Sequence, residues 1–533
     1  MAKQYHISKD MEYLHRLLLP FLLSFVFSTA LRAQAITGPQ GELFNIRLIA
    51  DKLSDPWEVT YGPDQYLWVT EAKGYRVLRI NPITGVKTVL LDLNNQRDFP
   101  RYDVIPDSAD GGKPWPQGGL MGMALHPRLL KGQPYVFLAY LYHFAGVNEQ
   151  GHGCAENFGG CYFTTRIVRY TYNSTRQKLE SPVVLCDSIP GSSDHNAGRL
   201  LIAPVSNEYY LFYSVGDMGA GQFDNAGRPN HAQNIDSYEG KILRFNVYPD
   251  ADSNRYNSWI PNDNPFCTAD HQSAVWSYGH RNAQGLAYAF IGGNYRLYAA
   301  EHGPFSDDEI NMVDAGKNYG HPLVIGYNDG NYDHLAAGVT AEASLPGPWH
   351  TSYPLINSEA ANAKAMGDSY RDPIKTLYPN TNAFLNNVMT RIRNNDPEKP
   401  TWPSEAPSSV SVYTSTAIPG WKNSLLVTTL KGGKLIRLQL DATGEHVISD
   451  TINYFKGRLR YRDLAISDDG YKIYLALDST IVSSGPTTVQ PMETAKRGSV
   501  IELTYIGNTR SSNKTPADSI PIQRLDVLPR RKP

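Results

Sequence analysis

Six copies of one strand pattern run along this chain, and they constrain its fold more than any other feature of the sequence. In each copy a first strand ends at a Pro or Asp turn, a very apolar strand follows, and a third strand of the type Gly-x-Ile-Leu-Arg comes next. The first copy, Trp57 to Ile80, contains WEVTYGPDQ, YLWVTE and YRVLRI. The third contains GRLLIAP, YYLFYSVGD and GKILRFNV. Turn signals between such runs predict an antiparallel sheet in each copy.

One such sheet cannot bury both of its faces, whereas six sheets packed radially can. We therefore predict an all-β fold, a six-bladed β-propeller of four-stranded antiparallel sheets with long inserted loops. The 34 Tyr, 44 Gly and 36 Pro residues agree with an all-β chain. A two-sheet sandwich with extra domains is the alternative, but the apolar runs are too many for one sandwich.

The first strand before the repeats, LFNIRLIA at Leu43 to Ala50, is a candidate last strand of the sixth blade that would close the ring. The propeller domain is predicted over residues 36–507. Residues 508–533 are rich in Ser, Pro and Arg and are predicted to be a disordered tail. Long irregular segments, which usually carry function or subunit contacts, interrupt the strands at Asn95 to Gln117, Asn148 to Thr164, Gly219 to Glu239 and Asn328 to Ser404.

The N-terminus has the pattern of a signal peptide over residues 1–35. A basic segment ending at Arg16 precedes the apolar run Leu17 to Ala30, and Ala33-Gln34-Ala35 supplies small residues for cleavage. This run is short for a bilayer span, although a retained membrane anchor is the alternative. We predict a secreted or periplasmic protein with no membrane span after cleavage. The 50 basic and 52 acidic side chains give no electrostatic case for a nucleic-acid partner.

Four cysteines would enter an oxidising compartment after export. Cys154 and Cys161 lie in one Gly-rich segment and could close a small loop, while Cys186 and Cys267 lie further along the chain. Four cysteines allow three full pairings, among which the sequence does not choose. Zinc binding is disfavoured because the chain has no CxxC pair.

Two clusters of polar residues indicate a cofactor enzyme. YGHRNAQGLAYAFIGGNYRLYAAEHGP, at Tyr278 to Pro304, opens a strand with Arg, Asn and Gln and ends in a Gly-Pro corner. SDHNAGRL, at Ser193 to Leu200, places a His beside an Asp. Such groups on a rigid β-scaffold are typical of the surroundings of a bound polar ligand.

At these residues the chain resembles the soluble pyrroloquinoline quinone (PQQ) dependent glucose dehydrogenases of the glucose/sorbosone dehydrogenase family. Nine segments occur in the family's order between Leu53 and Tyr505: WEVTYGPDQYLWVTE, QGGLMGMALHP, SSDHNAGRL, YSVGDMGAGQ, YGHRNAQGLA, EHGPFSDDEIN, GKNYGHP, LLVTTLKGG and RLRYRDLAISDDG. The family fold is a six-bladed propeller. The resemblance implies oxidation of an aldose at C1 to the lactone, with PQQ and calcium as cofactors.

The best base in the chain for the sugar hydroxyl is His195, because its ordinary pKa lies near 6.5 and suits proton abstraction at neutral pH. A carboxylate would fix the His195 tautomer, and the resemblance gives Asp217 that role, with Asp194 beside it. It also places Arg281 at the reactive quinone carbonyl, where its charge would stabilise the arriving hydride. On this basis the expected catalytic residues are His195, Asp217 and Arg281.

PQQ carries three carboxylates, which call for cations. Lys431, Arg460 and Arg462 suit this role, and strand alternation would put the two arginines on one face. The resemblance adds Asn282 as a cofactor contact. For the substrate side it implies Gln117, Asp194, Gln222 and Trp402. An ordinary role as surface or turn residues is the alternative for each of these side chains.

Calcium suits backbone carbonyl ligands, and the resemblance assigns the carbonyls of Gly303 and Pro304 to the calcium beside the cofactor. For further calcium sites near the family's dimer interface it implies Asp308, Glu309, Tyr319, Ile325, Tyr327 and Asp329. The spacing of Asp307-Asp308-Glu309 is not that of an EF-hand loop, so a solvated acidic turn is the alternative. A homodimer is compatible with these assignments.

Three departures from the family pattern bear on the sugar. The family's Tyr and Cys before the Trp-Pro pair are here Lys399 and Thr401, and an Asn after Gly-Pro is Phe305. The identity of the sugar therefore stays open. A calcium-dependent propeller lactonase and a non-catalytic binding propeller are the rival interpretations. Because the chain has no CxxCH haem motif, electrons would leave through an external acceptor.

Overall fold

The computed structural model describes residues 34–95, 118–144, 158–160, 162–252, 257–398, 400–457, 459–478 and 497–509. The expected signal peptide before Gln34, most of the expected tail, and Gln117, Cys154, Cys161 and Lys399 lie outside these residues. Cys186 and Cys267 both carry free thiols. Within the described part of the chain, no helix is long and apolar enough to cross a membrane.

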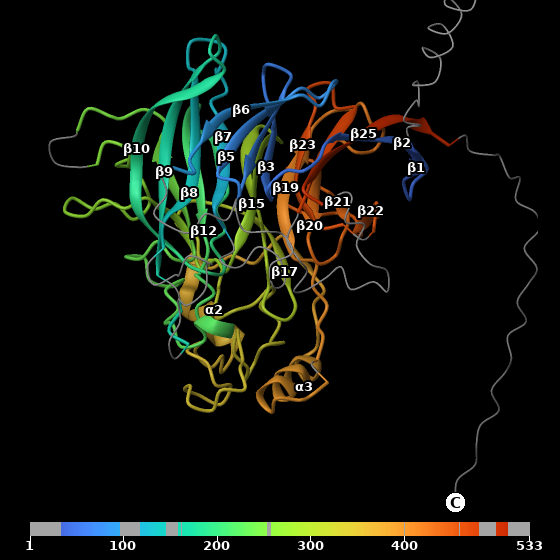
Figure 1. Ribbon diagram of the computed structural model, residues 1–533. Helices are drawn as coiled ribbons and strands as arrows, with labels where there is room; N and C mark the ends of the chain where they lie inside the picture. Colours follow the sequence, from blue (N-terminus) through green and yellow to red (C-terminus); the bar gives the residue numbers. More distant parts are fainter. Residues whose placement is uncertain are drawn as a thin grey trace, which may run out of the picture.

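The strands form six antiparallel sheets arranged as the blades of a propeller (Figure 1), as the repeats predicted. Blade 1 contains β3 (Pro56–Tyr61), β4 (Leu67–Glu71), β5 (Arg76–Ile80) and β6 (Lys87–Asp92). Blade 2 contains β7 (Leu120–Leu125), β8 (Tyr135–Phe144), β9 (Phe163–Asn173) and β10 (Lys178–Gly191). Blade 3 contains β11 (Leu200–Val205), β12 (Glu208–Val215), β13 (Lys241–Asn246) and β14 (Val275–Tyr278).

Blade 4 contains β15 (Ala283–Ile291), β16 (Asn294–Glu301), β17 (Asp308–Met312) and β18 (Lys375–Leu377). Blade 5 contains β19 (Pro407–Tyr413), β20 (Ser424–Thr429), β21 (Leu435–Gln439) and β22 (Ile452–Tyr454). Blade 6 contains β23 (Tyr461–Ile466), β24 (Lys472–Leu477) and β25 (Ser499–Asn508). The first strand of each blade is the innermost, and these strands contact one another around the ring.

The ring is closed by β2 (Glu42–Ala50), which pairs with β25 at the other end of the described chain. This strand contains the LFNIRLIA segment that the sequence singled out. A further short strand, β1 (Gln34–Thr37), pairs with the outer edge of β2, so blade 6 has five strands instead of four. Strand β1 includes Gln34 and Ala35, which overlap the predicted cleavage region.

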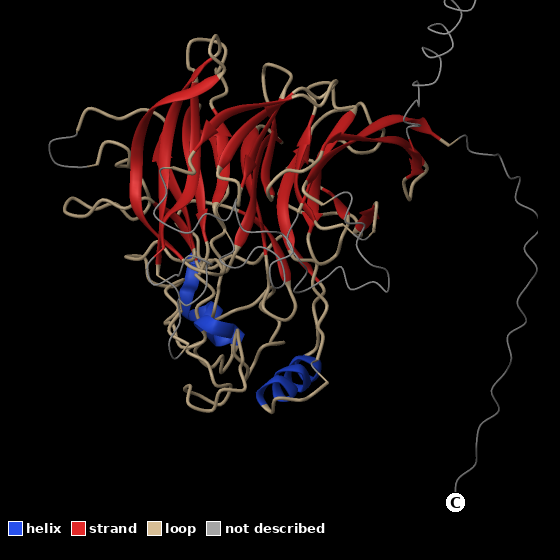
Figure 2. Cartoon of the chain, in the orientation of Figure 1, coloured by secondary structure: helices blue, strands red, loops and turns tan. Residues whose placement is uncertain are grey.

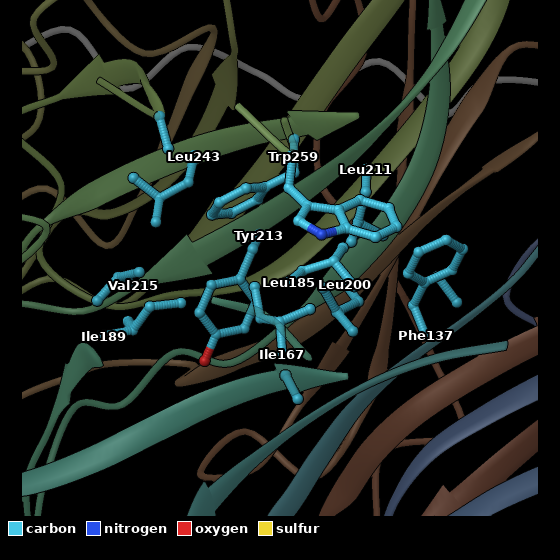
Figure 3. Close-up of a cluster of buried hydrophobic side chains, with 14 of the residues drawn as sticks. Phe137, Ile167, Leu185, Ile189, Leu200, Leu211, Tyr213, Val215, Leu243 and Trp259 are labelled. Carbon is cyan, nitrogen blue, oxygen red and sulfur yellow. The ribbon is translucent and has the colours of Figure 1, made fainter. Parts of the chain in front are cut away.

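Apolar side chains of neighbouring blades fill the space between the sheets. Figure 3 shows one such cluster, in which Ile167 and Leu185 of blade 2 meet Leu200, Tyr213 and other residues of blade 3. Burying one side chain of this size stabilises the fold by about 1.5–3 kcal/mol. Each face of a blade is thus covered by the next blade, which is why six copies fold together although one could not.

The long segments on either side of β18 lie together on one face of the ring and carry the helices (Figure 2). Helix α2 (Glu359–Met366) is capped by Ser358, whose side chain accepts from the Ala361 N–H. Helix α3 (Asn382–Arg393) is capped in the same way by Thr381 and buries Leu385, Val388 and Met389. Two 3₁₀ turns, η2 (Phe223–Asn225) and η3 (Gly367–Ser369), complete the helical elements of the described residues.

Candidate active site

The polar residues singled out in the sequence gather where inner strands begin and second strands end. His195 precedes β11, and Arg281 and Asn282 precede β15. Four second strands end in an acidic residue or within two residues before one, listed here in blade order: Glu71, Asp217, Glu301 and Asp478. Because alternate strands of an antiparallel sheet run in opposite directions, these two kinds of strand end meet at the same face of the ring.

His195 and Asp217 form a buried pair. The His195 Nδ1 lies 2.7 Å from the Asp217 Oδ1, and the two residues are 5% and 0% exposed. His195 has φ 47°, a left-handed conformation that is costly for a side chain of this size. Its carbonyl approaches Gly216 so closely that a Cβ there would lie 1.8 Å from the oxygen, so the Gly of SVGD is required by packing.

Asp217 is held by donors from several segments. Its Oδ1 also accepts from the Gly219 N–H, and its Oδ2 accepts from Asn230, His321 Nε2 and the Tyr353 hydroxyl at 3.1, 2.8 and 2.9 Å. Burial alone would raise the pKa of Asp217. The nearby His195 and the hydrogen bonds from His195 and His321 outweigh burial and hold that pKa well below its usual range. Asp217 is therefore a carboxylate that fixes the His195 ring with Nε2 outward.

Gln222 joins the base to the guanidinium of Arg281. Its side-chain nitrogen lies 2.8 Å from the His195 Nε2 and 2.9 Å from the Asp194 Oδ2. Its oxygen accepts from the Arg281 Nη2 at 2.6 Å. One amide thus links three polar side chains, His195, Asp194 and Arg281, that the sequence analysis expected in catalysis or substrate binding.

Three buried nitrogens beside the first two strands of blade 4 have no hydrogen-bond partner among the described residues: Arg281 Nε and Asn282 Nδ2, before β15, and His302 Nε2, after β16. The other donors of Arg281 are used, by Gln222 and by the His302 carbonyl. Burial, followed by the charges of His195, Arg281 and Arg462, holds the pKa of His302 well below its usual range. A buried polar atom left unsatisfied costs about 1–3 kcal/mol, so these three nitrogens suit a polar ligand.

Arg460 and Arg462 converge on one carboxylate. Arg462 Nη2 lies 2.7 Å and Arg460 Nε 3.5 Å from the Asp478 Oδ2. Arg462 Nη1 also donates to the Gln284 Oε1 at 2.8 Å. Asp55 lies beside Asp478, and its pKa is raised to about 7, first by burial and then by the Asp478 charge. Two arginines and two acids are thus packed together beside the axis.

Lys431, after β20, donates to the Trp402 carbonyl at 2.6 Å, and its ammonium lies 5.0 Å from the Trp402 ring centroid. Burial lowers the pKa of Lys431, although the charges of Asp308 and Glu405 oppose the shift. The Trp402 ring packs edge-on against Phe305 at 5.0 Å. Phe305, at which the chain departs from the family pattern, therefore contacts Trp402, which is expected to line the sugar site.

The Gly303-Pro304 corner is held by Asp308, whose carboxylate accepts from the Gly303 N–H at 2.9 Å. The same carboxylate accepts from the Ser404 hydroxyl and from the N–H groups of Glu405 and Ala406. Burial raises the pKa of Asp308 to about 6. Both oxygens of Asp308 thus already receive hydrogen bonds that join blade 4 to the segment before blade 5.

The other residues expected at calcium lie behind this corner. The Glu309 carboxylate accepts from the Gly326 N–H and Asn311, while the Tyr319 hydroxyl donates to the Met312 carbonyl. Ile325 donates its N–H to Glu359, and the carbonyl of Tyr327 accepts from the Asp329 N–H. Within the described ranges, no group of three or more His, Cys, Asp or Glu side chains is close enough to hold a metal ion.

Comparison with known proteins identifies the family. The glucose/sorbosone dehydrogenase family model matches residues 53–365 and 378–482. The chain belongs to this family. Quinoprotein glucose dehydrogenase B of Acinetobacter calcoaceticus is 33% identical over 490 residues, which cover 87% of this chain and 92% of that protein. The aldose sugar dehydrogenase YliI of Escherichia coli is 24% identical, over 82% of this chain and 90% of its own.

Solved structures of similar fold include two aldose sugar dehydrogenases. The PQQ-bound enzyme from Streptomyces coelicolor has a TM-score of 0.53 at 22% identity and covers 88% of this chain and 99% of its own. The apo enzyme from Escherichia coli has a TM-score of 0.55 at 22% identity, over 87% and 100%. At this identity the likeness supports the propeller fold shared with the glucose/sorbosone dehydrogenase family.

Several residues of this family member's site were missed by the sequence analysis. His321 and Tyr353 come from the long segment between β17 and β18, and no local pattern connects them to Asp217. His302 and Asp55 were likewise not singled out, and Gln284 was noted only as a polar residue that opens a strand, with no role assigned to it. Asp478 could have been found, because the repeats place an acidic residue after the second strand in this blade as in blade 3.

Proposed function

We propose that this protein is a PQQ- and calcium-dependent dehydrogenase that oxidises an aldose at C1 to the lactone. The observation that carries the proposal is the His195–Asp217 pair beside three buried nitrogens that lack partners among the described residues. The pair supplies a base, and Arg281 Nε and Asn282 Nδ2 among the three nitrogens supply donors for a polar ligand with carbonyl and carboxylate groups. Membership of a dehydrogenase family agrees with both.

His195 would take the proton of the sugar hydroxyl at Nε2. Its Nδ1 is engaged with the Asp217 carboxylate, which would stabilise the imidazolium as the proton arrives. The amide of Gln222 occupies the His195 Nε2 in this structure and also contacts Asp194. A sugar hydroxyl would take the place of the amide at Nε2, while Asp194 and Gln222 orient the ring.

The cations suit the cofactor. PQQ, when bound, supplies the ortho-quinone that accepts the hydride. Arg281 Nε and Asn282 Nδ2 would donate to its oxygens, and Lys431, Arg460 and Arg462 would balance its carboxylates. The quinoprotein name of the Acinetobacter relative and the PQQ-bound title of the Streptomyces structure support this assignment.

The remaining parts of the proposal rest on the sequence. Calcium would bind at the Gly303 and Pro304 carbonyls and behind them near Asp308 and Glu309. Export through the predicted signal peptide would place the enzyme in the periplasm or outside the cell. Electrons would pass to an external acceptor, and a homodimer is compatible with the proposed calcium sites.

The lactonase alternative needs a metal ion at the propeller axis. Here the side chain of Arg199 lies at the axis, which disfavours this alternative. The guanidinium of Arg199 contacts the first strands of four other blades there. A cation at that position repels a metal ion. The binding-propeller alternative is disfavoured by the intact His195–Asp217 pair.

The test is dye reduction by purified protein reconstituted with PQQ and calcium, across a panel of aldoses. We expect turnover that requires PQQ. Asp217→Asn is expected to lower kcat about a thousandfold or more, because the amide no longer fixes the His195 tautomer, and to leave the Kd for PQQ unchanged. Tyr353→Phe is the matched control, which removes one donor to Asp217 but keeps its charge, and should cost about tenfold at most.

Failure of the wild-type protein to bind PQQ would refute the cofactor assignment. Binding of PQQ without turnover of any aldose would show that the substrate class is wrong. Normal turnover by Asp217→Asn would refute the assignment of His195 as a base oriented by Asp217.

A further inference from the structure

A ring of β-bulges surrounds the axis of the propeller. The pairing register shifts at the second residue of four inner strands, which are Trp57 in β3, Gln284 in β15, Ser408 in β19 and Arg462 in β23. A bulged residue is left out of the ladder, and its side chain and backbone are re-aimed. The side chains of these four bulged residues therefore do not follow the alternation of the strand.

Arg199 occupies the centre of this ring. It directly precedes β11, is 2% exposed, and donates from Nε to the Gln284 carbonyl at 2.9 Å and from Nη2 to the Ser408 carbonyl at 3.2 Å. Its guanidinium lies 4.3 Å from the ring centroid of Trp57. One side chain of blade 3 thus contacts three of the bulged residues.

Two buried carboxyl groups hold the guanidinium in place. Arg199 Nη1 lies 2.5 Å from the Glu58 Oε2 and 3.2 Å from the Asp463 Oδ2. Asp463 also accepts from the Val59 N–H at 2.6 Å, which joins blade 6 to blade 1. A planar fork with five donors can satisfy such a set, whereas an ammonium cannot reach all of these acceptors at once.

The ring is connected to the candidate cofactor site through Gln284. Its carbonyl accepts from Arg199, and its side-chain oxygen accepts from Arg462 Nη1 at 2.8 Å. Arg462 is itself a bulged residue and faces Asp478. The chain Arg199–Gln284–Arg462 therefore runs from the axis to a cation of the site.

We propose that Arg199 is a positioning residue, which fixes the bulge at Gln284 and through it aims Arg462 at a carboxylate of the cofactor. The inference rests on the proposed function, because it assumes that PQQ binds at this site. The ion group at the axis, formed by Arg199, Glu58 and Asp463, would then contribute to ligand affinity as well as to stability.

The test compares the PQQ affinities of purified apoproteins by titration of the cofactor spectrum. Arg199→Lys keeps the axial charge but loses the fork, and we expect it to weaken PQQ binding about tenfold. Arg244→Lys is the matched control. Arg244 is 1% exposed and bonded to Asn264 in blade 3, so this variant should lose stability and keep the wild-type Kd.

A double-mutant cycle separates positioning from general destabilisation. If Arg199 acts through Arg462, Arg199→Lys should have no further effect on the Kd in an Arg462→Met background. If Arg199→Lys does not fold, Gln284→Ala, which removes the acceptor for Arg462, should reproduce the tenfold loss and the same non-additivity.

A wild-type Kd for Arg199→Lys, or effects of Arg199→Lys and Arg462→Met that add fully, would overturn the inference while leaving the proposed function intact. Wild-type protein that does not bind PQQ at all would overturn both. A variant that folds with a lowered Tm and an unchanged Kd would show that the axial group is only structural.

Discussion

Asp55 and Asp478 meet beside Arg460 and Arg462, and this pair makes a pH dependence predictable. Burial, followed by the Asp478 charge, raises the pKa of Asp55 to about 7, while Arg462 and Lys73 oppose the shift. The folded protein therefore holds a proton on Asp55 that the unfolded chain releases near pH 4. This contribution to stability is present at low pH and is lost as the pH rises from about 4 through 7.

The same titration should change cofactor affinity. Above pH 7 an ionised Asp55 would repel the carboxylates of PQQ, so the Kd should rise with pH through about 7. A rise of about tenfold corresponds to a one-unit increase of the Asp55 pKa on binding. Asp55→Asn should remove this dependence, as measured by PQQ titration between pH 5.5 and 8.5.

Asp64→Asn is the control, because Asp64 pairs with Arg79 in blade 1 and should leave the pH dependence in place. A wild-type Kd that is flat over this range would contradict the prediction. At this scale the sequence pointed to His195, and the family resemblance added Asp217 and Arg281, which the structure brings together through Gln222 and the His195–Asp217 pair. It could not identify Tyr353 or Asp55, whose roles depend on contacts between distant segments or on a buried neighbour.

At the scale of strands, the sequence predicted three strands in each blade but few of the outer fourth strands. β18 and β22 have three residues each, and β6 is largely half-exposed or exposed. Strands of three residues are too short to show an apolar pattern, and the exposure of most of β6 weakens its pattern. The β-bulges were also unpredictable, because they change pairing by one residue without changing the apolar pattern.

The closing strand β2 should be the most sensitive outer element. Ile46 pairs with Leu503 of β25 on one side and with Gln34 of β1 on the other. Proline at Ile46 removes a ladder hydrogen bond whichever side the N–H faces, and we expect a loss of about 3 kcal/mol in the free energy of unfolding. Urea unfolding of the purified protein measures this loss.

Ile36→Pro is the matched variant in β1, which is paired on one side only. It should cost much less, because proline is tolerated at a sheet edge. Equal losses in the two variants would mean that β2, although paired on both sides, contributes no more to the free energy of unfolding than the edge strand β1 does.

At the scale of the whole molecule, the segment between β17 and β18 joins the acidic residues of blade 4 to helix α2. Glu359 at the start of α2 is 0% exposed and accepts from the Ile325 and Tyr332 N–H groups. The buried Asp307 Oδ1 has no hydrogen-bond partner within the described ranges. Acids buried in one region repel one another, and calcium, which also accepts backbone carbonyl ligands, would relieve this repulsion although no three acids of the described residues meet at one point.

Calcium should therefore raise the Tm of the apoprotein. At 100 times its Kd, a ligand that binds only the folded state adds about 2.7 kcal/mol to the free energy of unfolding. We expect Glu359→Gln to reduce this calcium-dependent shift, and Glu342→Gln, at a position whose side chain accepts from nearby Ser344, to preserve it. Thermal unfolding with and without a chelator measures the shift, and magnesium should replace calcium poorly because it demands a tighter octahedral site. If calcium leaves the Tm unchanged, the buried acids must be stabilised by their protein donors and by protons alone. If it raises the Tm of Glu359→Gln as much as that of the wild type, the ion binds elsewhere, and the Gly303–Pro304 corner becomes the site to test next.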